Sequence, residues 1–124
     1  MTDHDADAPT TPADLFSVRG KTVMITGGTS GIGRMIAGGF VAAGATVVVT
    51  SRKADAVDQT VAELSEHGTI TGLPSDLSTE DGARALYEAV ASDHDHVDVL
   101  VNNAGATWGA PLADHDARSW QRVL

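Results

Sequence analysis

The stretch KTVMITGGTSGIGRMIAGGF, residues Lys21 to Phe40, decides the fold of this chain. It opens with the apolar run Val23 to Ile25, which is typical of a strand buried on both faces and which Thr26 and Gly27 end. Apolar residues then recur with helical spacing. They predict the inner face of a helix, at Ile32, Met35, Ile36 and Phe40. The stretch therefore predicts a strand, a tight loop and a helix.

The loop between this strand and this helix is rich in glycine, with Gly27, Gly28, Gly31 and Gly33. Glycine allows positive φ and carries no Cβ, so the backbone can turn sharply and approach an anion closely. The free N–H groups of the first helical turn and the helix dipole both favour negative charge there. The loop predicts a phosphate site, although a structural tight turn would look similar. Its TGxxxGxG spacing, which starts at Thr26, departs from the GxGxxG dinucleotide fingerprint.

Length and composition are those of a globular protein with room for one domain in 124 residues. Lys and Arg number 8 against 17 Asp and Glu, and the formal net charge of -9 disfavours nucleic acid and anionic lipid as partners. The acidity is also typical of a bias toward solubility. The chain has no Cys, no long apolar run and no leader-like start, so we expect a cytoplasmic protein with no membrane partner.

Residues 1–14 are polar and acidic, and we expect a disordered tail there, followed by one domain over residues 15–124. Leu15, Phe16 and Val18 are expected to pack against the edge of the sheet. His94 and His96 alternate in a polar loop, where we expect no metal site.

Three further apolar runs predict strands at Ala45–Thr50, Ile70–Leu73 and Val97–Val101, with helical patterns between them. Ser78 or Thr79 should cap the helix that precedes the last of these strands. Its expected inner face consists of Ala83, Leu86, Ala89 and Val90. Alternating strands and helices imply right-handed crossovers, so we predict an α/β fold with a Rossmann-type parallel sheet in the order 3-2-1-4.

Such sheets have further strands beyond the fourth. A chain that ends at Leu124, in a segment with a helical pattern from Asp114, would leave the fourth strand as a bare apolar edge. We therefore expect a fragment, the N-terminal part of a longer Rossmann domain. By itself it should be poorly soluble or self-associate through that edge.

Several motifs together resemble those of the short-chain dehydrogenase/reductase family. They are TGGTSGIG at Thr26–Gly33, Asp76 with Leu77 after the third strand, and NNAG at Asn102–Gly105 after the fourth. Their order and spacing match the family, and the resemblance covers residues 16–124, the cofactor-binding half of the family's fold.

The resemblance implies a role for each motif. The adenosine ribose and pyrophosphate would be bound, mainly by backbone N–H groups, at Gly27, Thr29, Ser30, Gly31, Ile32 and Gly33. Asp76 would accept a hydrogen bond from the adenine amino group, and Leu77 would pack near the ring or use its backbone. The alternative for Asp76 is a carboxylate that caps a helix.

The NNAG motif would lie at the nicotinamide end of the cofactor. Asn102, Ala104 and Gly105 would line the path to the nicotinamide ribose, whereas Asn103 would brace the sheet. The alternative is a turn that merely ends the strand.

The end of the second strand decides between NAD and NADP, because a carboxylate there would repel a 2′-phosphate. The residues are Ser51, Arg52 and Lys53, with no carboxylate, so we predict NADP, with NAD less favoured. Ser30 stands where many NADP-dependent members carry a basic residue. The alternative is that Arg52 and Lys53 are only solvated.

In this family a Tyr exchanges a proton with the alcohol or ketone while hydride passes to or from nicotinamide. A Lys four residues after the Tyr lowers the Tyr pKa, and a Ser orients the substrate carbonyl. The single tyrosine, Tyr87, is followed by Ala91 at that spacing, so this chain alone should be inactive and no catalytic residue is assigned. The alternative is a non-catalytic dinucleotide-binding or regulatory module. Family members usually form homodimers or homotetramers.

Within the family, GIGRMIA at Gly31–Ala37 and NNAGATWGAPL at Asn102–Leu112, with Trp120, resemble bacterial 3-oxoacyl-thioester reductases of the rhamnolipid type. The resemblance implies a small-molecule carbonyl or acyl-thioester substrate, which an acidic carrier protein could deliver. Trp108 could floor a substrate site or simply pack. Arg118 and Arg122 could meet the carrier or be solvated.

Overall fold

The computed structural model describes residues 10–107 and 109–124. Its elements in the first half of the chain are α1 (Pro12–Phe16), β1 (Thr22–Thr26), α2 (Gly31–Ala42), β2 (Thr46–Ser51) and α3 (Ala54–Leu64). Those in the second half are β3 (Thr69–Pro74), α4 (Glu80–Asp93), β4 (Val99–Val101), the 3-10 helix η1 (Leu112–Asp114) and α5 (Ala117–Val123). No helix in these described ranges is long and apolar enough to cross a membrane.

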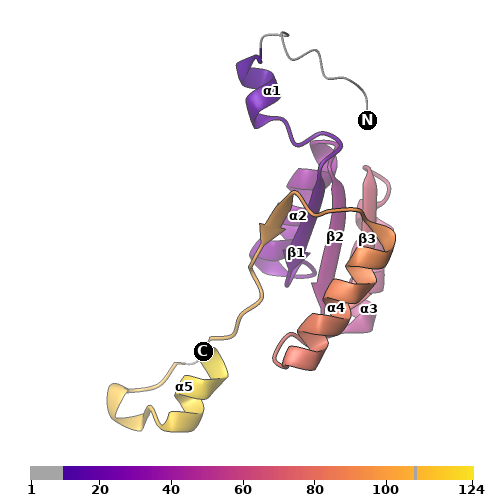
Figure 1. Cartoon of the computed structure of the whole chain (residues 1–124). Helices are drawn as coiled ribbons and strands as arrows, with labels where there is room; N and C mark the ends of the chain where they lie inside the picture. Colours follow the sequence, from indigo (N-terminus) through magenta and orange to yellow (C-terminus); the bar gives the residue numbers. More distant parts are fainter. Residues whose placement is uncertain (1–9, 108) are drawn as a thin grey trace.

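The four strands form one parallel sheet in the order β3-β2-β1-β4, which confirms the predicted α/β fold and strand order. Figure 1 shows α4 in front of this sheet and α2 and α3 behind it. The chain places β2 and β3 on one side of β1 and then crosses to β4 on the other side. Because crossovers are right-handed, this reversal puts α4 on the opposite face from α2 and α3.

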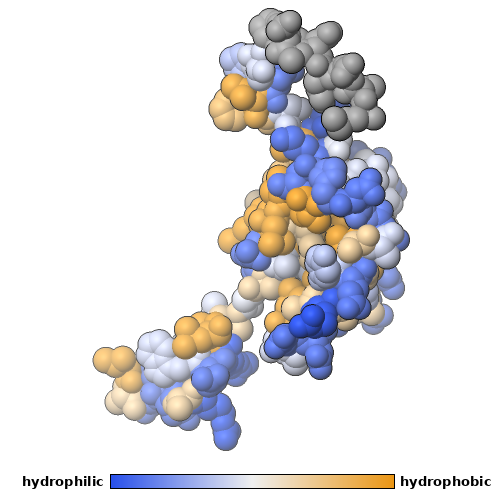
Figure 2. All heavy atoms as spheres, in the orientation of Figure 1, coloured by the Kyte–Doolittle hydropathy of each residue, from blue (hydrophilic) through white to orange (hydrophobic). Residues whose placement is uncertain are grey.

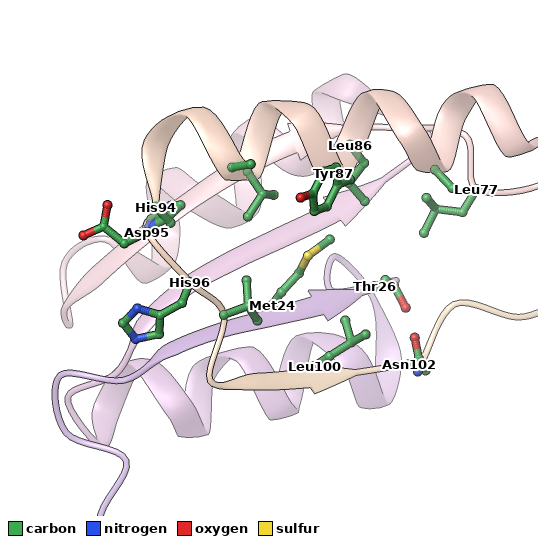
Figure 3. Close-up of a pocket in the computed structure, with 14 residues that line it drawn as sticks. Met24, Thr26, Leu77, Leu86, Tyr87, His94, Asp95, His96, Leu100 and Asn102 are labelled. Carbon is green, nitrogen blue, oxygen red and sulfur yellow. The ribbon is translucent and has the colours of Figure 1, made fainter.

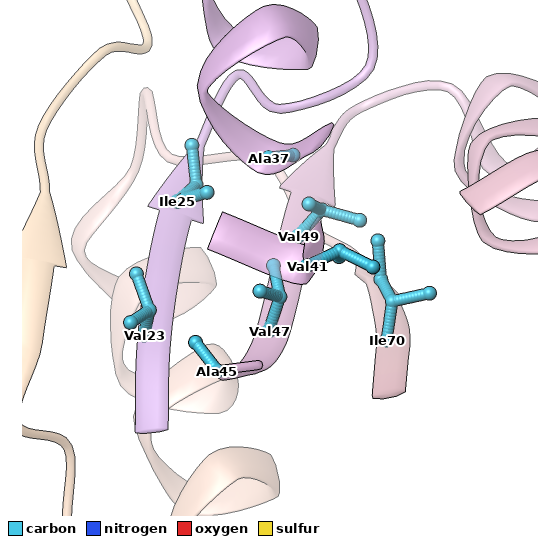
Figure 4. Packing of buried hydrophobic residues seen from close by; sticks show 8 residues of the cluster. All are labelled: Val23, Ile25, Ala37, Val41, Ala45, Val47, Val49 and Ile70. Atoms are coloured by element: carbon cyan, nitrogen blue, oxygen red, sulfur yellow. The ribbon is translucent and has the colours of Figure 1, made fainter. Parts of the chain in front are cut away.

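The sheet has a separate hydrophobic cluster on each face, because successive side chains of a strand point to opposite sides. The cluster shared with α2 and α3 (Figure 4) contains Val23, Ile25, Ala37, Val41, Ala45, Val47, Val49 and Ile70. The cluster shared with α4 contains Met24, Val48, Leu86 and Val90. Both faces of the central strands are therefore covered, as the continuous apolar runs predict.

Small residues, not the larger apolar ones, form the buried stripe of α2. Gly33, Ala37 and Val41 are buried, whereas Ile32 is 71% and Met35 76% exposed. Of the predicted inner face, only Ile36 and Phe40 pack against the core. The prediction was wrong by part of a turn because a helix that lies close to a sheet needs small side chains at the contact.

The inner face of α4 agrees better with its prediction. Leu86 and Val90 are buried, Ala89 is half-buried and Ala83 is exposed. The side chain of Thr79 caps the helix by accepting a hydrogen bond from the N–H of Gly82 at 3.0 Å.

At the N-terminus, residues 12–14 were expected to belong to a disordered tail, but they form the first part of α1. The first nine residues of that tail lie outside the described residues. Thr11 and Asp14 form a capping box that begins α1. Leu15 and Phe16 are 65% and 85% exposed, contrary to expectation, and only Val18 packs against the core.

The fourth strand is shorter than predicted, since β4 begins at Val99 rather than Val97. Asp98, just before it, ties this edge to β1. Its carboxylate accepts a hydrogen bond from the N–H of Thr22 at 2.8 Å and lies 3.2 Å from Nε2 of His96. The polar residues before β4 therefore fix its register against β1.

Replacing Gly72 by alanine should destabilise the sheet where β3 meets α3. A Cβ at Gly72 would overlap Cγ1 of Val57 and lie 2.9 Å from Cγ2 of Val61. Overpacking between stiff valines should lower the free energy of unfolding by about 1–3 kcal/mol, measured by chemical denaturation.

Gly39→Ala is the matched control for this prediction, because a Cβ at Gly39 meets nothing within 4 Å. In the interior of α2 it should raise the free energy of unfolding by about 0.5–1 kcal/mol. Equal effects of the two substitutions would contradict the packing argument.

Candidate functional site

The glycine loop joins β1 to α2 through two backbone positions that favour glycine. Gly27 has φ of 65° and Gly31 has φ of 52°, both in the left-handed region. Gly33 is needed for a different reason. A Cβ on Gly33 would overlap the carbonyl oxygen of Gly27, because the first turn of α2 lies directly against the backbone of the loop.

The N-terminus of α2 faces open space. Ser30 is the N-cap, with an extended backbone, and its side chain makes no capping hydrogen bond. A Cβ built on Gly31 meets no other atom within 4 Å. The first N–H groups of the helix therefore keep their capacity to bind, and an anion such as a pyrophosphate fits this donor set.

The segment after β4 is bonded to the glycine loop. The side-chain Nδ2 of Asn103 donates to the carbonyl oxygen of Gly27 at 3.1 Å. The hydroxyl of Thr26 accepts from the N–H groups of Asn103 and Ala104, each at 3.0 Å, and donates to the carbonyl of Val101 at 3.3 Å. Asn103 thus braces β4 against β1, as the resemblance implies.

Thr26 is a structural junction at the candidate site that the candidate residues from the sequence omit. It is 6% exposed and joins the glycine loop to the NNAG segment. The available signal was a threonine as the last residue of a buried strand, where its hydroxyl needs partners. Asn102, Ala104 and Gly105 are exposed beside this junction.

The end of β2 lies next to the glycine loop in the sheet. Thr26 pairs with Thr50 in the register, and the N–H of Gly28 donates to the carbonyl of Thr50 at 3.3 Å. Ser51 follows Thr50 and is half-buried, whereas Arg52 is exposed. The guanidinium of Arg52 is therefore available at the same edge as the loop.

Asp76 lies just after β3, on the other side of β2. Its Oδ1 accepts from the N–H of Ser78 at 3.0 Å and from the hydroxyl of Ser78 at 2.6 Å. These hydrogen bonds lower the pKa of Asp76, and the positive charge of Arg52 contributes less in the same direction. Asp76 does not cap α4, because Thr79 has that role.

Leu77 belongs mainly to the core. It is half-buried and packs against the cluster under α4, and it also borders the groove described below. The sequence-predicted residues after β3 and β4 are thus brought to one edge of the sheet with the glycine loop, at the carboxyl ends of the strands. Ligands bind at this edge in open parallel sheets.

A groove of about 620 Å³ runs from this edge between α4 and β4. Figure 3 shows Met24, Leu86, Tyr87 and Leu100 along it. Thr26, Leu77 and Asn102 lie at the end near the glycine loop, and His94, Asp95 and His96 lie at the opposite end. Hereafter it is called the α4–β4 groove.

Comparison with known proteins shows which family this sequence resembles. The family profile described as short chain dehydrogenase matches residues 21–124. The chain is 43% identical over 109 residues to the rhamnolipids biosynthesis 3-oxoacyl-acyl-carrier-protein reductase of Pseudomonas aeruginosa, over 88% of this chain and 43% of that protein. It is 33% identical over 113 residues to the 2-dehydro-3-deoxy-D-gluconate 5-dehydrogenase of Formosa agariphila, over 90% of this chain and 43% of that protein.

Solved structures of similar sequence have the same fold over the part that this chain covers. The Pseudomonas aeruginosa RhlG/NADP active-site complex is 44% identical, with a TM-score of 0.83 over 87% of this chain and 42% of that chain. L-sorbose reductase from Gluconobacter frateurii, complexed with NADPH and L-sorbose, is 34% identical, with a TM-score of 0.79 over 85% of this chain and 41% of that one.

The chain therefore spans less than half the length of these relatives. The matched residues contain the glycine loop, the braced NNAG segment and the whole four-stranded sheet. On this sequence match and this fold, the chain belongs to the short-chain dehydrogenase family.

Proposed function

We propose that this chain is the cofactor-binding part of an NADP(H)-dependent oxidoreductase that interconverts carbonyl and alcohol groups. The observation that carries the proposal is the open N-terminus of α2, where Ser30 makes no side-chain capping hydrogen bond and a Cβ on Gly31 would meet nothing within 4 Å. A pyrophosphate at that position would receive backbone hydrogen bonds and the favourable field of the helix dipole.

Different candidate residues along the edge of the sheet would bind different parts of the cofactor. The pyrophosphate and adenosine ribose would be bound by Gly27, Thr29, Ser30, Gly31, Ile32 and Gly33. Asp76 and Leu77 would bind the adenine. Asn102, Ala104 and Gly105 take the nicotinamide ribose, held in position through the bonds of Thr26 and Asn103.

NADP is favoured over NAD by the residues at the end of β2. Ser51 and Arg52 stand where a carboxylate would repel a 2′-phosphate, and the positive charge of Arg52 can make a charge-assisted contact with that phosphate. The chain carries a net charge of -9, so attraction of the 2′-phosphate must come from nearby groups such as Arg52. Structures of similar proteins solved with NADP or NADPH support the choice of NADP.

NADPH, when bound, supplies the hydride that reduces a carbonyl carbon. The residues of this chain bind the cofactor and orient it. We propose a 3-oxoacyl thioester as substrate, because the 43% identical relative is named as a 3-oxoacyl-acyl-carrier-protein reductase. A carrier protein would then deliver the acyl group.

A non-catalytic dinucleotide-binding or regulatory module is the second candidate function. It needs no catalytic pair, and Tyr87, which is 71% exposed on α4, does not supply one, because Ala91 rather than a lysine stands four residues later. The coding sequence beyond Leu124 distinguishes the two. A serine followed by Tyr-x-x-x-Lys supports the oxidoreductase, whereas a stop codon favours the module.

Gly33→Ala should weaken NADPH binding about ten-fold or more, since the new Cβ would push α2 away from the loop that holds the pyrophosphate. Fluorescence titration with NADPH measures the affinity. Gly39→Ala, on the same helix and away from any contact, should bind as the parent chain does. A folded Gly33→Ala variant with parental affinity would overturn the assignment of the loop.

Arg52→Gln should weaken NADPH binding about ten- to a hundred-fold and leave NADH binding almost unchanged, because a charge-assisted hydrogen bond contributes about 1.5–3 kcal/mol. Lys53→Gln removes the same charge one residue later and should have a smaller effect on both cofactors. If the parent chain binds NADH more tightly than NADPH, the proposed preference is wrong.

With NADPH and a 3-oxoacyl thioester, the 124-residue chain should show no turnover by NADPH absorbance, although it should bind NADPH. It supplies cofactor contacts without a tyrosine and lysine at catalytic spacing. Measurable turnover that Tyr87→Phe abolishes would contradict this expectation.

A further inference from the structure

Arg34 stands near the start of α2, where a positive charge is unfavourable. The positive end of the helix dipole lies at this terminus, and no acidic residue in the first turn offsets it. Arg34 directly follows Gly33, the residue that lies against the backbone of the glycine loop. A charge that opposes a local rule beside a candidate site indicates that the tertiary structure requires it.

Arg34 reaches across to α3 and binds two residues there. Its Nη1 donates to the hydroxyl of Thr60 at 3.1 Å, and its Nη2 forms an ion pair with the carboxylate of Glu63. Thr60 is buried, with 1% of its surface exposed. The side chain of Gln59 donates to the other carboxylate oxygen of Glu63 at 2.9 Å. This hydrogen bond, and then the charge of Arg34, lower the pKa of Glu63 and so keep its carboxylate ionised.

The start of α3 is not fixed by a capping side chain. Lys53 is the N-cap of α3, and its side chain makes no capping hydrogen bond. A hollow of about 520 Å³ borders this end of the helix and is lined by residues 53–56 and Gln59. Only Arg52 and Lys53 separate β2 from α3, so a shift of the first turn of α3 would be carried directly to Arg52.

Arg34 thus joins the two parts of the candidate site that would bind phosphate groups. Its backbone belongs to α2, which packs against the glycine loop, and its guanidinium holds α3, which follows Arg52. Figure 1 shows both helices behind the sheet. The distance between the glycine loop and Arg52 therefore depends on this bridge.

We propose that Arg34 is a positioning residue that holds α3 against α2 and so keeps Arg52 within reach of the 2′-phosphate of NADP. Arg34 itself would not contact the cofactor, because Nη1 and Nη2 are both bound to α3. NADH lacks the 2′-phosphate, so its binding depends on the glycine loop and not on the bridge. The effect on cofactor choice rests on the proposed function, whereas the bridge can be tested without cofactor.

Arg34→Met removes both contacts and keeps much of the side-chain bulk. In fluorescence titrations it should weaken NADPH binding about five-fold and NADH binding less than about two-fold, because only the 2′-phosphate depends on Arg52. Arg34→Lys should recover only part of the loss, since a single ammonium group cannot replace the two-pronged guanidinium. Equal weakening of both cofactors by Arg34→Met would overturn the proposal.

Arg84→Met is the matched control for the loss of one positive charge. Arg84 pairs at 3.1 Å with Glu80 of its own helix, α4. Figure 2 shows a hydrophilic surface over α4, which lies in front of the sheet and away from α2 and α3. This variant should leave both affinities unchanged, and an effect equal to that of Arg34→Met would mean that charge alone is responsible.

Glu63→Ala separates positioning from charge by the sign of its effect. It removes a negative charge, so electrostatics alone predicts tighter NADPH binding. Loss of the bridge predicts the opposite, NADPH binding weakened about three-fold. Tighter binding by Glu63→Ala would refute the positioning role of Arg34.

Hydrogen exchange of the cofactor-free chain tests the bridge independently of the proposed function. Val57 makes the first hydrogen bond of α3, to the carbonyl of Lys53 at 3.1 Å. Arg34→Met should speed exchange at the amides of residues 57–60 about five-fold and leave those of β1 unchanged, because α3 would open locally more often. Parental exchange rates in a variant that circular dichroism shows to be folded would rule out the bridge.

The parent titration separates the two proposals. If the parent chain does not bind NADPH, the proposed function is wrong, and the effect of Arg34 on cofactor choice is wrong with it, even where exchange responds to the bridge. If the parent chain binds NADPH and Arg34→Met binds it equally well, only the positioning role fails.

Discussion

The contact between the first turn of α2 and the backbone of the glycine loop is the constraint on which the rest of the structure depends. Gly33 lies so close to the carbonyl oxygen of Gly27 that no Cβ fits between them. The same closeness continues along α2, where Ala37 and Val41 meet the sheet. Because α2 sits this close, β1 is covered along its length and the helix N-terminus opens toward the carboxyl edge.

That edge gathers polar groups from segments far apart in the sequence. The hydroxyl of Thr26 and the amide of Asn103 join the ends of β1 and β4, so hydrogen bonds hold the NNAG segment against the glycine loop. Arg52 and Asp76 lie at the ends of β2 and β3. In a chain with a net charge of -9, such directed donors, rather than the overall field, must attract an anionic ligand.

Predictions from the sequence were correct where the structure depends on local patterns alone. Alternating strand and helix patterns with short connections allow few topologies, so the order 3-2-1-4 could be predicted. The family was predicted separately, from the resemblance of the glycine loop and the NNAG segment to its motifs. It failed for α2, whose large residues Ile32 and Met35 are exposed. Helical periodicity identifies an apolar side, but the distance between helix and sheet decides whether small or large residues fill the contact. The bonds of Thr26 were missed because they join residues more than 70 positions apart.

By itself, the sequence determined the elements, the strand order and the glycine loop, because periodicity, turn chemistry and the handedness of crossovers are local or nearly local properties. Only the tertiary structure decided which side of α2 is buried, how Thr26 and Asn103 lock two strands together, and where apolar surface stays uncovered. These features depend on distances between segments that are remote in the chain. Leu100 illustrates this, because it is one more apolar strand residue in the sequence, but in the packed sheet it is 55% exposed and lines the α4–β4 groove.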